Sequence, residues 1–253
     1  YNIQRSLRFR SSASAYLSRT PASASNQTTW TWSGWVKFGL TGVNAFFGAG
    51  STGNGNTGLH FFKQSNDTIR LEQSVWGSST AYYFDTTQVF RDYSAWYHFV
   101  LAFDSTQATS TNRIKFYVNG NLVTAYTNYQ APTQNLNGIV NSTVLHNIGR
   151  AQGQSGYDYF DGYLAEINFI DGQALTPSSF GSTNATTGVW QSLPYTGTYG
   201  ANGFYLPFTD NSALTSGSNV GLGKGDWART SQATETTGTR TTSRSPAGLP
   251  TTP

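Results

Sequence analysis

Two strand-rich segments, residues 96–123 and residues 160–171, restrict the possible fold of this chain more than any other part of its sequence. In the first segment two apolar runs are separated by Asn119 and Gly120, both of which tolerate the positive φ that a type I′ turn requires. The second segment is an apolar run between Asp-Gly pairs, which is typical of a core strand bounded by turns. Together they predict an all-β protein in which two antiparallel sheets pack as a sandwich.

The alternation of side chains indicates how individual strands lie in such a sandwich. Residues 113–118 alternate, with Ile114, Phe116 and Val118 on one face and Arg113, Lys115 and Tyr117 on the other. One face of this strand is therefore expected to meet the core and the other to meet water. Residues 96–104 are apolar on both faces, which predicts a central strand that is covered on both sides.

The composition excludes several classes of function. Charged residues make up only 11% of the 253 residues, and the cations are scattered, whereas nucleic-acid binding requires clustered ones. No apolar run of about 18 residues is present, so we expect no membrane insertion. Because cysteine is absent, disulfides, thiolate catalysis and cysteine-based zinc sites are excluded.

The sequence changes character towards its C-terminal end. We expect residues 1–210 to form one β-sandwich domain and residues 211–253, rich in Gly, Ser, Thr and Pro, to form an extended tail. From Ala228 onwards the one hydrophobic residue besides the alanines is Leu249, which is too little apolar area to offset the entropy of ordering. The tail is therefore expected to be extended or disordered unless a neighbouring subunit holds it.

Several short motifs spread over residues 5 to 210 are shared with a known superfamily. They comprise Trp96, His98 and Asp104, the hairpin at residues 117–120, Ile148-Gly149, the strand at residues 160–167, and Leu175-Thr176. With these motifs the chain resembles the concanavalin A-like lectin/glucanase superfamily, in its laminin-G-like and pentraxin-like branch. The versions at residues 170–175 and 203–208 look like domains in virion proteins of tailed bacteriophages.

The resemblance implies a two-sheet jelly roll that is displayed on fibres, tails or capsid surfaces and is either glycan-binding or purely structural. Hydrolases of the superfamily carry a Glu-x-Asp-x-x-Glu cluster on one strand, which this chain lacks. We therefore predict a non-enzymatic bacteriophage virion protein at the particle surface, as fibre, spike or capsid decoration, with a lectin-like module that adheres to surface glycans. The expected partners are other virion subunits, further copies of this chain and host-surface glycans. The alternatives are a purely structural decoration or assembly protein and, as an outsider, a glycan-degrading enzyme.

Aromatic residues, 15% of the chain, supply the candidate glycan contacts. Exposed rings can stack on sugar faces, whereas most large rings are buried. We expect Trp32, Trp35 and Trp96 to be buried in the core. The candidate ligand-binding residues lie beside the polar loop at residues 77–80 and are Trp76, Tyr82 and Tyr83.

Asp158 and Asp161 are the candidate metal ligands, since calcium requires several oxygen ligands and many lectin-like sandwiches hold it in loops. A turn at Asp161 is the alternative interpretation, and we expect no obligatory cofactor. No catalytic residue is expected. Glu166 is interpreted as a structural residue that caps loop amides or pairs with an arginine, and His98 as a hydrogen-bonded residue of the core or sheet.

Overall fold

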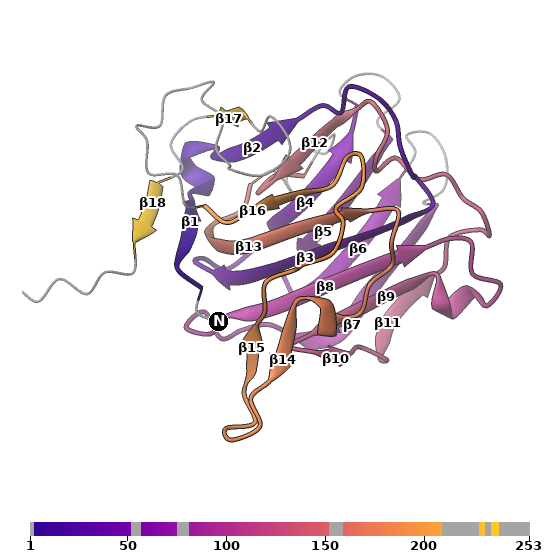
Figure 1. Ribbon diagram of the computed structural model, residues 1–253. Coiled ribbons are helices and arrows are strands. Elements are labelled where there is room, and N and C mark those ends of the chain that lie inside the picture. Colours follow the sequence, from indigo (N-terminus) through magenta and orange to yellow (C-terminus); the bar gives the residue numbers. More distant parts are fainter. Residues whose placement is uncertain are drawn as a thin grey trace, which may run out of the picture.

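The computed structural model describes residues 3–51, 57–74, 81–151 and 159–208, and the backbone of two strands at residues 228–230 and 234–237 (Figure 1). Two large antiparallel sheets face each other across one main hydrophobic core. Sheet A contains, in order, β10 (Asn121–Leu122), β9 (Ile114–Val118), β8 (Tyr97–Asp104), β3 (Thr29–Phe38), β13 (Gly162–Asp171), β1 (Arg5–Phe9) and β18 (Thr234–Thr237), with β16 (Phe204–Leu206) paired to β13. Sheet B contains β11 (Tyr126–Gln130), β7 (Tyr82–Val89), β6 (Thr68–Ser74), β5 (Gly58–Lys63), β4 (Asn44–Gly50), β12 (Leu145–Ile148), β2 (Tyr16–Arg19) and β17 (Ala228–Thr230).

Short elements complete the described part of the chain. A separate hairpin consists of β14 (Gly181–Thr183) and β15 (Trp190–Ser192). The helical turns are η1 (Ser11–Ala13), η2 (Ser110–Asn112) and η3 (Pro177–Ser179). Within the described residues, no helix has the length and hydropathy needed to cross a membrane.

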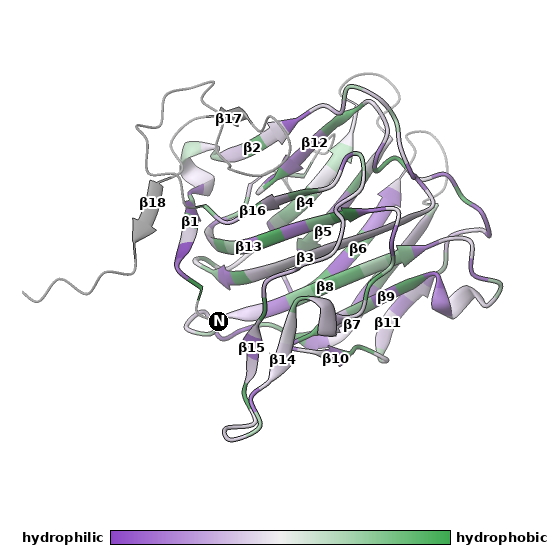
Figure 2. Cartoon of the chain, viewed as in Figure 1, coloured by the Kyte–Doolittle hydropathy of each residue, from purple (hydrophilic) through white to green (hydrophobic). Residues whose placement is uncertain are grey.

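Aromatic rings fill the space between the two sheets, because alternate residues of facing strands point inward. Trp30 and Trp32 of β3 are fully buried, and Trp32 packs edge-on against Phe61 of sheet B with 5.4 Å between ring centroids. Phe46 of β4 lies 5.1 Å from Phe61 and 5.6 Å from Phe99 of β8. Figure 2 shows the hydrophobic colour along the central strands β8 and β13. The predicted two-sheet sandwich is therefore confirmed, and packing of large rings holds it together.

The hairpin and the core-facing side of the strand predicted at residues 113–118 are also confirmed. Asn119 and Gly120 join β9 to β10 with φ values of 47° and 84°. Ile114, Phe116 and Val118 belong to the core between the sheets. The opposite face does not meet water at Tyr117, as was expected, because this side chain is buried in a second apolar cluster on the outer face of sheet A. β8 lies between β9 and β3, and both of its faces are buried.

The tryptophans differ in part from expectation. Trp32 is in the core, but Trp35 lies on the opposite face of β3, where its ring stacks on His98 at 5.0 Å. Trp96 is half-buried and is not part of the core. The expectation for Trp96 was wrong because β8 begins one residue later, at Tyr97, so the strand pairing does not fix the orientation of Trp96.

The C-terminal strands correct one expectation about the tail. β17 pairs with β2 and β18 pairs with β1, so each sheet is extended by one strand of the same chain. A neighbouring subunit is therefore not required to hold these two segments, because backbone hydrogen bonds to a free sheet edge provide the partner. The boundary at residues 210/211 stays a prediction, since residues 209–227 lie outside the described part.

Candidate functional site

Tyr82, one of the three predicted glycan contacts, is a core residue. Its side chain is fully buried, its ring lies 5.3 Å from that of Phe103, and its hydroxyl donates to Gln73 Oε1 at 3.3 Å. Burial raises the pKa of Tyr82 far above its ordinary value. The ring therefore has no face available to a sugar. Trp76 lies outside the described residues.

Tyr83 points to the other side of β7, as strand alternation requires, and is partly exposed. The guanidinium of Arg70 lies 5.2 Å from the centre of its ring. Arg70 in turn pairs with Glu72 at 2.7 Å and with Asp85 at 3.4 Å. Of the two predicted contacts within the described part, Tyr83 is the accessible one, but a charged network already occupies one face of its ring.

Asp161, a predicted metal ligand, is bound by protein groups. Its Oδ1 accepts from Arg8 Nη2 at 2.8 Å, and its Oδ2 accepts from the backbone N–H of Ser11 at 3.1 Å. The carboxylate therefore joins the start of β13 to the end of β1, which is a structural role. Asp158 lies outside the described residues, and among those described no group of three or more His, Asp or Glu could hold a metal ion.

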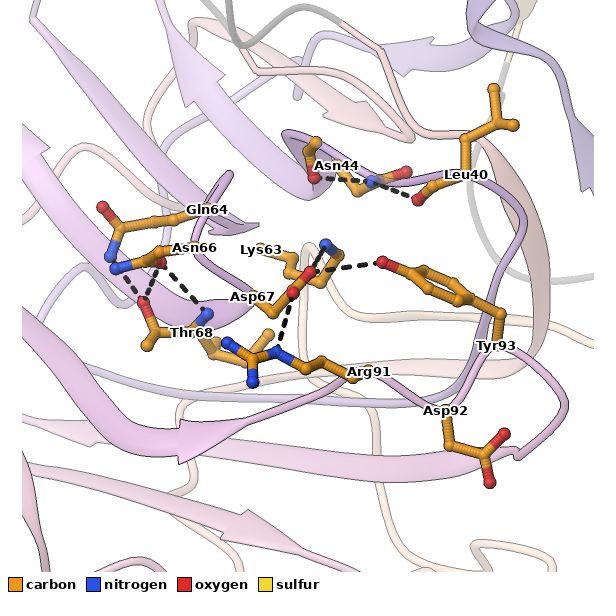
Figure 3. A network of polar contacts seen from close by, with 12 residues as sticks. Leu40, Asn44, Lys63, Gln64, Asn66, Asp67, Thr68, Arg91, Asp92 and Tyr93 are labelled. Carbon is orange, nitrogen blue, oxygen red and sulfur yellow. Dashed lines mark hydrogen bonds and ion pairs between the residues drawn. The ribbon is translucent and has the colours of Figure 1, made fainter.

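A second acidic group, Asp67 in the β5–β6 turn, is surrounded by cations and a hydroxyl (Figure 3). Its Oδ1 accepts from Lys63 Nζ at 2.7 Å and from the Tyr93 hydroxyl at 3.2 Å, and its Oδ2 accepts from Arg91 Nε at 3.2 Å. Burial raises the pKa of Asp67, but the hydrogen bond and charge of Lys63 and the hydrogen bonds of Arg91 and Tyr93 outweigh this effect. The pKa of Asp67 therefore lies below its ordinary value. Lys63 is fully buried, so this ion pair links the turn to the interior.

A serine and a histidine lie in hydrogen-bonding contact on the outer face of sheet A, with Ser33 Oγ 2.9 Å from His98 Nε2. The indole N–H of Trp190 in β15 donates to His98 Nδ1 at 2.9 Å. Because an indole nitrogen is a donor only, Nδ1 must be the acceptor and the proton of the neutral ring must lie on Nε2. His98 then donates to Ser33 and has no lone pair with which to accept the serine proton. This pair is therefore arranged for packing and not for nucleophilic catalysis.

The state of His98 can be tested directly. Burial lowers the pKa of His98 to about 3, so the ring stays neutral through the physiological range. We expect nitrogen NMR of the histidine side chains to show a neutral Nε2–H tautomer for His98 from about pH 5 to about pH 8. In Trp190→Phe, which keeps a ring over His98 but removes the donor, we expect a mixture of tautomers. An Nδ1–H tautomer or an imidazolium in the unmodified protein would contradict this assignment.

Glu166 lies at a bulge in β13, where the register with β3 shifts between Ala165 and Asn168. Its φ is 50°, a conformation that side-chain-bearing residues adopt at a cost. Its Oε2 accepts from the hydroxyl of Tyr205 at 2.6 Å, and the neighbouring Asn168 accepts from the hydroxyl of Tyr199 at 2.9 Å. Through Tyr205, Glu166 therefore helps to hold the segment that covers this face of sheet A, which is a structural role.

An open cleft, called here the edge cleft, lies where the chain passes from sheet A to sheet B. Its volume is about 330 Å³, and aliphatic residues form part of its floor. The polar and aromatic residues that line it are Thr111, Asn112, Lys115, Thr124, Tyr126 and Tyr129. The cleft exists because β10 has two residues and pairs with Tyr117 and Val118, which leaves the first half of β9 as a free edge within the described part.

The two tyrosines of the edge cleft come together through a bulge. The pairing of β11 with β7 shifts register between Tyr126 and Asn128, so residues three apart lie on the same side. The ring centroids of Tyr126 and Tyr129 are 5.3 Å apart. The hydroxyl of Tyr126 donates to Val123 O at 3.0 Å, which fixes the ring orientation, and both side chains are half-buried. The sequence pattern does not predict this pair, because a period of two assigns the residues to opposite faces.

A smaller hollow, called here the outer hollow, lies on the outer face of sheet A beside the edge cleft. It has a volume of about 150 Å³, and both Asn112 and Lys115 line it as well as the edge cleft. Ala102 lies directly opposite Lys115 in the β8–β9 register, and its small side chain leaves room there. Tyr117 and Asp104 also line the hollow. Together the two hollows present aromatic rings next to hydroxyl, amide and charged groups along one border of the sandwich.

Comparison with known families identifies the fold. The family model for the concanavalin A-like lectin/glucanases superfamily, of the laminin G type, matches residues 11–180. The chain belongs to this superfamily. A search of curated protein sequences gives no significant match.

Two solved structures resemble the chain at low sequence identity. A candidate carbohydrate binding protein from Bacteroides ovatus is similar with 17% identity and a TM-score of 0.57, over 94% of this chain and 60% of that one. A heptameric SAP-like pentraxin from Limulus polyphemus is similar with 17% identity and a TM-score of 0.50, over 69% of this chain and 78% of that one. At such identities the likeness shows the shared fold. The concanavalin A-like jelly roll expected from the sequence is thereby confirmed.

Proposed function

We propose that this chain is a non-catalytic carbohydrate-binding module that holds a glycan in the edge cleft. The observation that carries the proposal is the paired rings of Tyr126 and Tyr129 beside the side chains of Thr111, Asn112 and Thr124. Ligand sites are concave, with aromatic walls and a few polar groups that fix orientation, and their volumes begin at about 300 Å³. The resemblance in fold to a candidate carbohydrate binding protein supports the same assignment.

Each group of the edge cleft has a role in this proposal. The tyrosine rings offer an apolar surface to the C–H face of a sugar while their hydroxyls are held by the protein. Thr124 and Asn112 are exposed and supply a hydroxyl and an amide for the ring hydroxyls of the sugar. Because the cleft is already open, a ligand can enter without a change in the backbone.

The edge cleft is tested by Tyr129→Ala. We expect this variant to lose about tenfold in affinity for a glycan found by array screening, which corresponds to about 1.4 kcal/mol. The measurement is isothermal titration calorimetry on variants with an unchanged thermal transition. Asn112→Ala, which alters an exposed residue of the same cleft, is expected to weaken binding without a loss of stability.

The matched control is Tyr83→Ala, because Tyr83 is also partly exposed but lies outside the edge cleft on sheet B. We expect its affinity to be unchanged. If Tyr83→Ala abolishes binding and Tyr129→Ala does not, the glycan binds on sheet B and the edge cleft is not its site. If no glycan on the array binds, a purely structural role is the better assignment.

The absence of catalysis is part of the proposal. The described carboxylates that could act on a glycosidic bond are engaged by protein groups, Glu166 by Tyr205 and both Glu72 and Asp85 by Arg70. A bound oligosaccharide is therefore expected to be recovered intact after incubation with the protein, as checked by mass spectrometry. Turnover that disappears in Glu166→Gln would establish a glycan-degrading enzyme instead.

The proposal extends to the place where the module acts. We propose that it is displayed on the surface of a tailed-bacteriophage particle, as part of a fibre, spike or decoration protein, and that several copies assemble together. The motifs at residues 170–175 and 203–208 support this setting, as does the small share of charged residues. Proteomics of purified particles, with antibody labelling in electron microscopy, would test it. Failure to find the chain in intact particles would exclude the virion role without affecting glycan binding.

A further inference from the structure

We infer that the edge cleft selects saccharides carrying an anionic group, a carboxylate or a sulfate, which binds to Lys115. This inference rests on the proposed carbohydrate binding and adds the chemical class of the ligand. It is carried by the position of Lys115 between the two hollows and by the distribution of charge around it.

Lys115 is a partly buried cation that no acidic group neutralises at close range. It is the one charged residue lining the edge cleft in the described part of the chain. Within that part no hydrogen bond or ion pair reaches its ammonium group. An ammonium group so placed gains free energy when an anion replaces part of its water shell.

The acidic residue nearest in the lining, Asp104, is already engaged elsewhere. It lines the outer hollow with Lys115, but its Oδ1 accepts from Thr106 Oγ1 at 2.6 Å and its Oδ2 accepts from Gln107 Nε2 at 2.6 Å. Because Asp104 belongs to the outer hollow alone, an anion is repelled from that side. The favourable position is therefore on the edge-cleft side of Lys115.

A second cation strengthens the positive potential of the edge cleft. The guanidinium of Arg113 donates to the backbone oxygens of Gln107 at 2.8 Å, Pro132 at 2.9 Å and Ala108 at 3.0 Å. These partners are uncharged, so the full charge of Arg113 remains. Burial raises the pKa of Tyr129, and the positive charge of Arg113 acts in the opposite direction, in keeping with a cation near the wall of the cleft.

The geometry of a bound ligand follows from these positions. One sugar ring lies on Tyr126 and Tyr129, and its anionic substituent points along β9 to Lys115. Asn112, shared by both hollows, is placed to bind the neighbouring hydroxyl groups. A neutral sugar can stack on the same tyrosine rings but offers no counter-charge to the ammonium group of Lys115.

The test compares three probes of equal length: an oligogalacturonide, a sulfated galactose oligosaccharide and a neutral galactose oligosaccharide. We expect at least one anionic probe to bind about tenfold more tightly than the neutral one. Lys115→Gln is expected to lose about tenfold in affinity for that probe and less than about twofold for the neutral one. The advantage of the anionic probe should shrink when salt is raised from about 0.05 M to about 0.5 M. Which anionic probe binds identifies the group as carboxylate or sulfate.

The matched control is Lys37→Gln, a lysine of β3 that lines neither hollow and whose loss should leave every affinity unchanged. Equal affinity for anionic and neutral probes, or an unchanged affinity in Lys115→Gln, would overturn the inference. If either result is obtained and Tyr129→Ala still weakens binding of the neutral probe, the proposed function stands without the inference. If no probe binds and the glycan array is also negative, both the inference and the proposed function are wrong.

Discussion

Gly162→Ala is expected to lower the free energy of unfolding by at least about 3 kcal/mol. Gly162 has a φ of 149°, which side-chain-bearing residues rarely adopt, and it is paired on both sides, with Phe38 of β3 and Phe9 of β1. A Cβ atom at this position would lie 2.2 Å from the backbone oxygen of Lys37. That oxygen belongs to a central strand and cannot retreat without breaking the β3–β13 pairing. Chemical denaturation of both proteins measures the loss.

A control separates the clash from the cost of the backbone conformation. Gly42 also has a positive φ, 89°, but a Cβ atom there would meet nothing within 4 Å. Gly42→Ala should therefore cost only the conformational penalty of about 1–2 kcal/mol. Equal losses in the two variants would show that crowding at Gly162 is not the cause.

Asp67→Asn is expected to lower the free energy of unfolding by about 3–5 kcal/mol, because it leaves a buried ammonium group without its counter-charge. The side chain of Lys63 has a relative accessibility of 0%, and its Nζ lies 2.7 Å from Asp67 Oδ1. Water therefore cannot replace the lost carboxylate. The rings of Phe38 and Tyr93, at 5.5 Å and 5.8 Å from Nζ, compensate in part through cation–π attraction. Thermal and chemical unfolding measure the change.

The double variant Lys63→Met/Asp67→Asn is the control, because it removes the charge as well as its partner. It should recover most of the lost stability, and failure to do so would show that Asp67 acts through Arg91 or Tyr93 instead.

The same pair predicts a dependence on pH. The pKa of Asp67 is lowered in the folded protein, so the unfolded chain binds this proton more readily. The contribution of the pair is therefore present above about pH 4 and is lost as the pH falls through the lower pKa of the folded state. Asp67→Asn should lack this part of the acid-induced loss. A stability difference between the two proteins that is constant from about pH 2 to about pH 6 would argue against the mechanism.

The fold could be predicted because its strongest signals are local. The pair Asn119-Gly120 needs only its own φ preferences to form a turn, and the alternation at Ile114, Phe116 and Val118 needs only the strand period. The expected burial of Trp96 was wrong because long-range strand pairing decides where β8 begins. Trp96 lies just outside the hydrogen-bonded part of that strand and is half-buried. The pairing of β17 with β2 and of β18 with β1 could not be predicted, because backbone groups form these contacts and the two segments lack an apolar side-chain pattern.

The candidate site was harder to predict than the fold, because irregularities create it. Tyr126 and Tyr129 share a side through a bulge, and no side-chain pattern announces where a bulge will form. Tyr82 and Tyr83 are both neighbours of a polar loop, but adjacent residues of a strand point to opposite sides. One of the two rings therefore has to point into the core, and it is that of Tyr82. A sequence signal for the edge cleft did exist: the apolar run after Gly120 is only Leu122 and Val123, too short for a strand that would close the edge of β9.

The order of the strands places β10 and β11 at one border of the two sheets and β18 and β17 at the other, with β1 and β2 next to them (Figure 1). The first strand and the last described strands thus leave the body at the border remote from Lys115 and the tyrosine pair. If the module is tethered to a larger object through either of those strands, the border proposed to bind glycans points away from the tether. If the proposed glycan binding holds, many copies fixed in this way would present their edge clefts in parallel, and weak individual contacts would add up to firm attachment.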